Sequence, residues 1–82
     1  MKVGKVTHYY NKAGVAILEL EGTLKIGDKV KFLGHGVDFE QPVVEMQINH
    51  KQVEEASKGE VVGFKMAEGA PEVKEGTEVL KV

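Results

Sequence analysis

The sequence predicts a small all-β domain in which antiparallel strands close into a barrel. Short runs rich in valine, threonine and tyrosine are separated by glycines and charged turns about every 8–12 residues, the spacing of all-β sandwiches and barrels. Only residues 49–58 have a helical pattern. Connections are short, and closure would remove the edges that so small a sheet would otherwise expose.

The length of 82 residues fits one domain that covers residues 1–82. A chain of this size buries only roughly 60–65% of its unfolded surface, so its core is small. The absence of cysteine excludes disulfides, thiolate zinc sites and cysteine nucleophiles, and it favours a reducing cytoplasm. The first residues lack the apolar core of a signal peptide, and no apolar run approaches the roughly 20 residues that span a bilayer, so no membrane contact is expected.

The first strands are expected between residues 2 and 32. Residues 2–10, KVGKVTHYY, have the composition of a strand, and residues 11–14, NKAG, supply turn chemistry. Residues 15–20, VAILEL, predict a strand that is covered on both faces or closes the barrel. After the glycine-bracketed connection at residues 21–27, residues 28–32 alternate apolar residues with lysines and predict the next strand.

The remaining strands are expected after the GHG turn at residues 34–36. Residues 39–48, FEQPVVEMQI, predict one long strand. Pro42 cannot donate a ladder hydrogen bond, so it belongs at an edge or a bulge. Residues 61–66 and 77–82 complete about six strands, in keeping with a small barrel.

One short helical turn near residues 50–58 is the most helix that the sequence allows. Lys51 and Glu55, and likewise Glu54 and Lys58, are spaced i,i+4 and would pair on one face of a helix. Each such pair is worth about 0.3–0.5 kcal/mol, which supports no more than a brief helical segment.

The apolar side chains of these segments form the predicted core. Burying one such side chain contributes roughly 1.5–3 kcal/mol, and chain entropy offsets most of the sum. The residues expected in the core are Val6, Val15, Ile17, Leu24, Ile26, Val30, Phe32, Met46, Ile48, Val53, Phe64, Met66 and Leu80.

Two segments together resemble the second domain of translational GTPases, a family that includes elongation factor Tu and bacterial initiation factor two. They are GTLKIGDKVKFLG, residues 22–34, and VVEMQINHKQVEEASKGEVVGF, residues 43–64. Residues 3–10, VGKVTHYY, and residues 34–56 also resemble free-standing elongation-factor-like small proteins and the C-terminal barrel of the U32 peptidase family. The resemblance implies a closed six-stranded Greek-key β-barrel.

The same resemblance implies a site, because this domain helps to hold the aminoacylated end of tRNA in the elongation and initiation factors. The matching positions are Glu45, Met46, Gln47, Asn49 and His50. Leu18 and Glu19 depart from the family, since they stand where its glycine and arginine would be. The implied function is a non-catalytic module that contacts tRNA, the ribosome or a translation-related protein. A net charge of −2 and the lack of arginine predict weak, local RNA contact.

A second hypothesis is a protein–protein adaptor, or an accessory barrel for a U32-type peptidase or an RNA-modifying enzyme. The acidic balance and the GHGVDF similarity motivate it. No GxxxxGK[ST] phosphate loop occurs, so GTP binding within the chain is not expected. Ser57 is the only serine and has no candidate base nearby in sequence, so nucleophilic catalysis is not expected. No cofactor is expected either.

His50 lies close to two glutamates, which raises the alternative of a metal or acid–base site. On a helical turn His50 and Glu54 would face the same way, and His8 or His35 would join them. Zinc sites usually need three converging ligands and supporting hydrogen bonds, so no metal is expected. The favoured interpretation is a polar corner in which His50 bonds to backbone, followed by contact with a ligand or partner.

Tyr9, Tyr10 and His35 are expected to provide secondary contacts. The two tyrosines are adjacent and point to opposite faces of a regular strand, so one is exposed. The exposed ring could stack on a base, although cross-strand packing is the default role. His35 lies in LGHG, residues 33–36, where a plain turn is favoured over a phosphate-binding nest.

Overall fold

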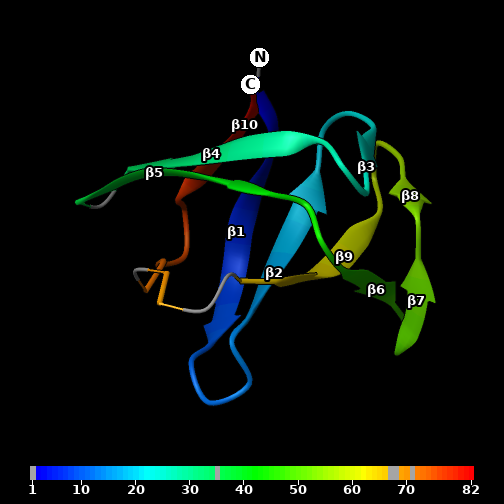
Figure 1. Cartoon of the computed structure of the whole chain (residues 1–82), viewed down its shortest axis with the longest axis horizontal. Helices are drawn as coiled ribbons and strands as arrows, with labels where there is room; N and C mark the ends of the chain where they lie inside the picture. Colours follow the sequence, from blue (N-terminus) through cyan, green and yellow to red (C-terminus); the bar gives the residue numbers. More distant parts are fainter. Residues whose placement is uncertain (1, 35, 67–68, 71) are drawn as a thin grey trace.

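The computed structural model describes residues 2–34, 36–66, 69–70 and 72–82, and this part of the chain contains strands and no helix (Figure 1). The whole measures 28 × 28 × 20 Å. The strands are β1 (Lys2–Tyr10), β2 (Val15–Leu20), β3 (Leu24–Lys25), β4 (Lys29–Gly34), β5 (Val37–Pro42), β6 (Met46–Ile48), β7 (Lys51–Val53), β8 (Glu55–Ala56), β9 (Val61–Lys65) and β10 (Glu78–Lys81). The all-β prediction is therefore confirmed for the described residues.

Eight strands form one antiparallel sheet in the order β5-β4-β10-β1-β2-β9-β6-β7, and β3 pairs with β8 separately. Within the described residues no ladder joins β5 to β7, so the predicted closed six-stranded Greek-key barrel is not confirmed. The sheet still curls, and Figure 1 shows β4 and β5 crossing the direction of β1 and β2. The buried Gln41 amide contacts the curled sheet at β9, donating to the Lys65 carbonyl oxygen at 3.3 Å.

Most predicted strands are present. β1 and β2 have the predicted bounds, and β4, β9 and β10 lie on the predicted segments with ends shifted by one or two residues. The single strand expected over residues 39–48 is wrong, because β5 ends at Pro42 and β6 begins only at Met46. A proline cannot donate to a ladder, and the Val43 N–H that follows it donates to the Asp28 carbonyl oxygen at 2.7 Å instead.

No helical turn forms at residues 50–58, which is within the predicted limit of at most one short turn, and β7 and β8 occupy the segment instead. Asn49 and His50 form a two-residue turn between β6 and β7, with φ angles of 52° and 64°. Two consecutive positive φ angles are characteristic of the type I′ hairpin turn, whose twist matches that of the flanking strands. The i,i+4 charge pairs were worth only tenths of a kilocalorie. Glu55 pairs instead with Lys25 on the neighbouring strand, at 3.6 Å.

Three tetrapeptide turns share one hydrogen-bond pattern, which the sequence analysis missed. They are KIGD (25–28), SKGE (57–60) and KEGT (74–77), and each directly precedes a long strand: β4, β9 and β10. In each turn the third-position glycine has a φ angle near 90°, a conformation that suits glycine in type II turns. The fourth side chain accepts a hydrogen bond from the first N–H, at 3.0, 2.7 and 3.3 Å.

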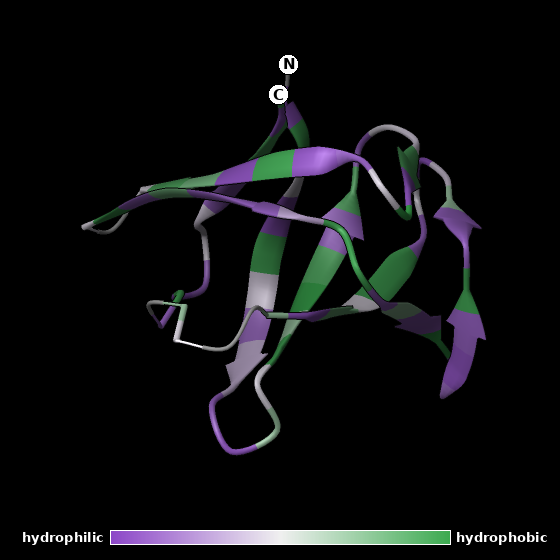
Figure 2. Cartoon of the chain, viewed as in Figure 1, coloured by the Kyte–Doolittle hydropathy of each residue, from purple (hydrophilic) through white to green (hydrophobic). Residues whose placement is uncertain are grey.

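The core lies between the curled strands and contains an aromatic cluster. The Phe32 ring stacks on Phe39 at 5.1 Å and meets Phe64 edge to face at 5.5 Å, which connects β4 and β5 to β9. Figure 2 shows hydrophobic and hydrophilic residues alternating along β4, as a strand with one core face requires. The core predictions that the structure confirms are Val6, Leu24, Val30, Phe32, Met46, Phe64 and Met66.

The core prediction for β2 is wrong by one residue. Val15 and Ile17 were expected inside, whereas the structure buries Ala16 and the leucines that alternate with it and leaves Val15 and Ile17 half-buried on the outer face. The one polar residue of VAILEL, Glu19, shares the outer face with Val15 and Ile17 in an alternating strand, and this signal was overlooked in the core prediction. Ile26 and Leu80 are wrong as well, since Ile26 is exposed and Val79 is buried in place of Leu80. Ile48 and Val53 are half-buried and pack against the core.

Candidate binding groove

A groove of about 500 Å³ lies on the outer face of β2 and β9. Val15 and Ile17 of β2 and Val61 of β9 line it with aliphatic side chains, and Tyr10 forms one wall. Tyr10 and Val61 are 52% and 51% exposed. The volume falls in the range of ligand pockets, and a concave apolar surface with a few polar groups is typical of binding sites.

Gly63 forms the floor of the groove. It lies opposite Ile17 on β2 and opposite Gln47 on β6. A Cβ added at Gly63 would lie 3.4 Å from Val15 Cγ1 and 3.9 Å from Ile17 Cδ1, which are ordinary contact distances. The backbone at Gly63 has room for a side chain. The centre of the face is therefore open because glycine has no side chain to fill it.

The rim of the groove is polar and comes from β6 and its turn. Gln47, Asn49 and His50 line this rim. The type I′ turn holds Asn49 and His50 in a fixed conformation beside Val61, so neither residue needs a long loop to reach the groove. On the opposite side the His8 ring lies 4.5 Å from the Tyr10 ring, edge to face, which supports that wall.

The structure brings together some of the predicted site residues and separates others. Gln47, Asn49, His50 and Tyr10 line the groove. Met46 is fully buried with its side chain in the core, so it supports the site only from behind.

Three further predicted residues lie away from the groove. Glu45 is half-buried and is not among the described lining residues. Tyr9 lines a neighbouring depression. His35 lies outside the described residues.

The apolar floor was missed by the sequence analysis. Val15 and Ile17 were assigned to the core, and Gly63 was treated only as part of a strand. The available signal was the glycine inside VVGF, since a glycine within a strand often marks a place where a ligand or another backbone approaches closely.

A second depression, of about 410 Å³, adjoins the groove at the β1–β2 turn. Lys12, Lys65 and Tyr9 line it, and Ala13 of the turn lines both surfaces. We call it the lysine depression. Lys65 is the cross-strand neighbour of Val15, so the cationic and apolar surfaces are continuous.

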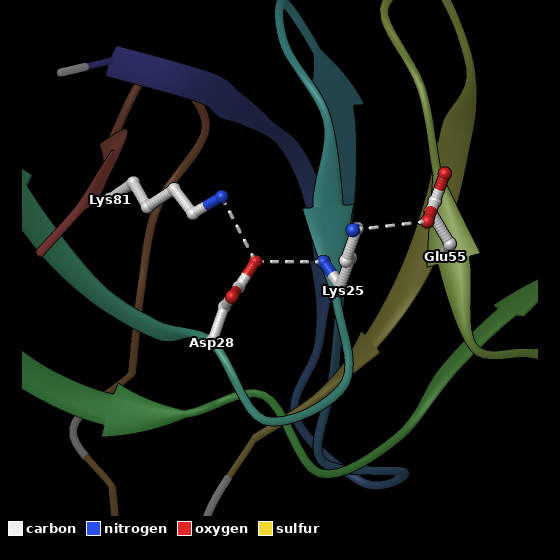
Figure 3. Close-up of polar contacts among 4 residues, drawn as sticks. All are labelled: Lys25, Asp28, Glu55 and Lys81. Atoms are coloured by element: carbon white, nitrogen blue, oxygen red, sulfur yellow. Dashed lines mark hydrogen bonds and ion pairs between the residues drawn. The ribbon is translucent and has the colours of Figure 1, made fainter.

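Charges on another side of the molecule are paired with one another. The pairs are Lys25–Glu55 at 3.6 Å, Lys29–Glu40 at 3.2 Å, Lys31–Asp38 at 3.3 Å and Lys81–Asp28 at 3.2 Å, and we call these eight residues the ion-paired side. Figure 3 shows Asp28 between the Lys81 ammonium and the Lys25 backbone N–H, which donates to its carboxylate at 3.0 Å.

The pKa of Asp28 is lowered from its ordinary value of 3.8. Partial burial acts to raise this pKa, but the hydrogen bond from the Lys25 N–H and the hydrogen bond and charge of Lys81 together outweigh it. The Lys25 charge adds to the same effect. Asp28 is therefore held as a carboxylate where β3, β4 and β10 meet.

The described residues offer little for metal binding. No group of three histidine, aspartate or glutamate side chains gathers among them in a way that could hold a metal ion. The helical turn that would place His50 and Glu54 on one face does not form, because that segment enters β7. The described part of the chain also contains no helix that could cross a membrane.

Comparison with known proteins gives a relative and a fold. No protein-family model matches the chain. Over 67 residues, 80% of its length, the chain is 46% identical to an uncharacterized protease of Methanocaldococcus jannaschii, and it spans 16% of that protease's length.

Among solved structures, the chain is similar to the C-terminal domain of a candidate U32 peptidase of Geobacillus thermoleovorans. The TM-score is 0.89, with 20% identity over 99% of this chain and 91% of that one. The selenomethionine variant of that domain gives a TM-score of 0.89, with 21% identity over 99% of both chains. The chain therefore has the fold of this C-terminal domain.

Proposed function

We propose that this chain is a non-catalytic accessory domain that binds a protein partner of the U32 peptidase type through the groove. The observation that carries the proposal is the match in fold to the C-terminal domain of a candidate U32 peptidase. The match covers nearly all of both chains, so a unit of this size occurs as one part of a larger peptidase-type protein. The 46% identity to a segment of a protease supports the same association.

An accessory role agrees with the chemistry of the groove. Its described lining residues are mainly aliphatic, with amide groups, one imidazole and one phenol at the edges. Such a surface binds by excluding water and by a few oriented hydrogen bonds, whereas hydrolysis would require an activated nucleophile. The groove therefore suits recognition, and the reaction belongs to the partner.

The test is association in trans. The Methanocaldococcus jannaschii protease would be prepared with its matching segment deleted and mixed with this chain, with complex formation followed by isothermal titration calorimetry. We expect a complex with an affinity on the order of micromolar. The intact protease is the matched control, and it should bind this chain more weakly because its own segment occupies the surface.

The absence of detectable binding between the two proteins at concentrations on the order of tens of micromolar would contradict the proposal.

The competing role is contact with tRNA or the ribosome. The observation that favours it is that Gln47, Asn49 and His50, which resemble part of the tRNA-end site, line one groove. Aminoacyl-tRNA and ribosomes would therefore be titrated at low and moderate salt. If either binds and Gly63→Val abolishes that binding, the groove is a site for RNA and not for a protein partner.

A further inference from the structure

We propose that the groove and the lysine depression together bind an extended peptide segment in which an apolar side chain stands next to a carboxylate. The inference rests on the proposed function, because it names the part of the protein partner that the groove takes. It follows from three features of the two surfaces: their polarity, their continuity and the charge left unpaired beside them.

The groove takes the apolar side chain. Among its described lining residues there is no lysine and no carboxylate. Val15, Ile17 and Val61 provide aliphatic walls, and the open floor at Gly63 leaves depth for a side chain to enter. The polar rim, with Gln47 and Asn49, can hydrogen-bond to the backbone of a bound segment, which an extended peptide presents at every residue.

The lysine depression takes the carboxylate. Lys2, Lys25, Lys29, Lys31 and Lys81 each pair with a carboxylate of this chain. In the described part of the chain Lys12 and Lys65 have no acidic side chain within ion-pair distance. The same holds for Lys5, Lys51, Lys58 and Lys74, but only Lys12 and Lys65 line the lysine depression, which has no described acidic lining residue. Two ammonium groups that share one concave surface, and that have no ionic partner among the described residues, favour an anionic ligand group.

The two surfaces are close enough for one short segment to occupy both. Ala13 lines both of them, and Lys65 is the direct cross-strand neighbour of Val15. In an extended peptide, alternate side chains on one face lie about 6.6–7 Å apart. A bound segment can therefore place an apolar residue over Val15 and Ile17 and an acidic residue, two positions away, against Lys12 and Lys65.

A peptide fits these features better than RNA does. RNA binding generally uses a basic surface with stacking aromatics, whereas this chain has a net charge of −2, no arginine and one exposed tyrosine on the groove. The aliphatic floor matches an aliphatic or aromatic side chain more closely than the polar edges of a base. The charge beside it is limited to two lysines, which suits a single carboxylate.

The lysine depression and the end of the groove at the β1–β2 turn lie away from the two described ends of the chain. Lys2 of β1 pairs with Leu80 of β10, so the two described ends of the chain lie side by side. The β1–β2 turn, which carries Ala13, lies at the opposite end of β1 (Figure 1). At about 3.3 Å per residue, the nine residues of β1 separate these two ends by roughly 25–30 Å.

The test is an array of overlapping peptides of about twelve residues that covers the Methanocaldococcus jannaschii protease, probed with this chain. We expect the bound peptides to carry an apolar residue with an acidic residue two positions away. For the tightest peptide, measured by fluorescence anisotropy, replacing its acidic residue by the corresponding amide should weaken binding about 5–10-fold. Binding should also weaken between about 50 and 200 mM salt.

Variants of this chain separate the two surfaces. The double variant Lys12→Gln/Lys65→Gln should weaken the same peptide about 5–10-fold, and Gly63→Val should weaken it at least about tenfold by filling the groove. Lys58→Gln is the matched control, because Lys58 is an exposed lysine that lines neither surface. Circular dichroism of each variant checks that the fold is kept.

Several outcomes would overturn the inference. They are an array in which no peptide binds, bound peptides that lack acidic residues, and a single-stranded RNA oligonucleotide that displaces the peptide and loses affinity in the same variants. The inference fails without the proposed function if the chain binds the truncated protease in trans and neither Gly63→Val nor the double lysine variant weakens that complex. The proposed function fails first if the chain does not bind the truncated protease at all.

Discussion

The ion-paired side and the groove use similar residues in opposite ways. On the ion-paired side, Lys29, Lys31 and Lys81 each lie 3.2 or 3.3 Å from a carboxylate of the same chain. Beside the groove, Lys12 and Lys65 have no such partner in the described part of the chain. Charges that are satisfied within the chain are unavailable to a ligand, whereas unpaired charges beside an open apolar surface can bind one.

The two regions also differ in how the backbone is held. At the ion-paired side the Asp28 side chain and main chain connect β3, β10 and the segment after β5, through the Lys25 N–H, the Lys81 ammonium and the Val43 N–H. At the groove, Gly63 contributes only ladder pairing and an absent side chain. The first region therefore maintains the fold, and the second presents a surface that the fold itself does not need.

The largest expected effect comes from an aromatic cluster that joins both regions. Phe32 of β4 is fully buried and touches Phe39 of β5 and Phe64 of β9. Phe32→Ala should lower the free energy of unfolding by about 3–5 kcal/mol, which for a domain this small removes much of its stability. Urea denaturation followed by far-UV circular dichroism measures this loss. Tyr10→Ala is the control, since Tyr10 is half-exposed, and a comparable loss there would contradict the assignment of the core.

A smaller effect on stability is expected from alanine substitutions at two glycines that lie within strands. A Cβ at Gly4 of β1 would lie 2.7 Å from the Glu19 carbonyl oxygen, a backbone atom that cannot move aside freely, whereas a Cβ at Gly63 meets only ordinary contacts. Gly4→Ala should therefore cost about 1–3 kcal/mol, while Gly63→Ala should be neutral or slightly stabilising. Thermal denaturation of the two variants gives the comparison. Equal losses at both positions would mean that the groove face is as closely packed as the β1–β2 contact.

The sequence was most informative where strands begin and end at turn residues. NKAG at residues 11–14 separates two runs of β-forming residues, and β1 and β2 therefore have their predicted bounds. It was less informative where a strand is almost wholly apolar, as in β2, because a single polar residue, Glu19, marks the outer face that Val15 and Ile17 share. The register shift between Val6 and His8 opposite β2 leaves no mark in the sequence.

The candidate site was predictable only in part, for a related reason. Gln47, Asn49 and His50 follow one another along the chain, so a local resemblance could identify them. The apolar floor comes from β2 and β9, whose pairing of Ile17 with Gly63 joins residues 46 positions apart. A polar corner at His50 was the favoured interpretation, but the tight hairpin turn and the strand β7 that follows it were not predicted, because the nearby charge pairs also suit a helix.

The smallest expected effect concerns the ion-paired side and depends on pH. Because the folded state lowers the pKa of Asp28 below 3.8, ionised Asp28 contributes stability that is fully present above pH 3.8. This contribution is lost as the pH falls through the lower pKa of the folded protein. Asp28→Asn should thus cost about 1 kcal/mol at neutral pH and flatten the decline in stability at acidic pH.

Urea denaturation at a series of pH values from neutral to strongly acidic measures this dependence. Asp38→Asn is the matched control, because Asp38 also pairs with a lysine at 3.3 Å but its side chain is 65% exposed. An exposed pair of this kind is worth about 0–1 kcal/mol, so Asp38→Asn should leave both the stability and its pH dependence close to those of the unmodified chain. If the two variants behaved alike, the hydrogen bond from the Lys25 N–H would contribute nothing beyond the charge of Lys81. The two regions would then differ only in the number of their ion pairs.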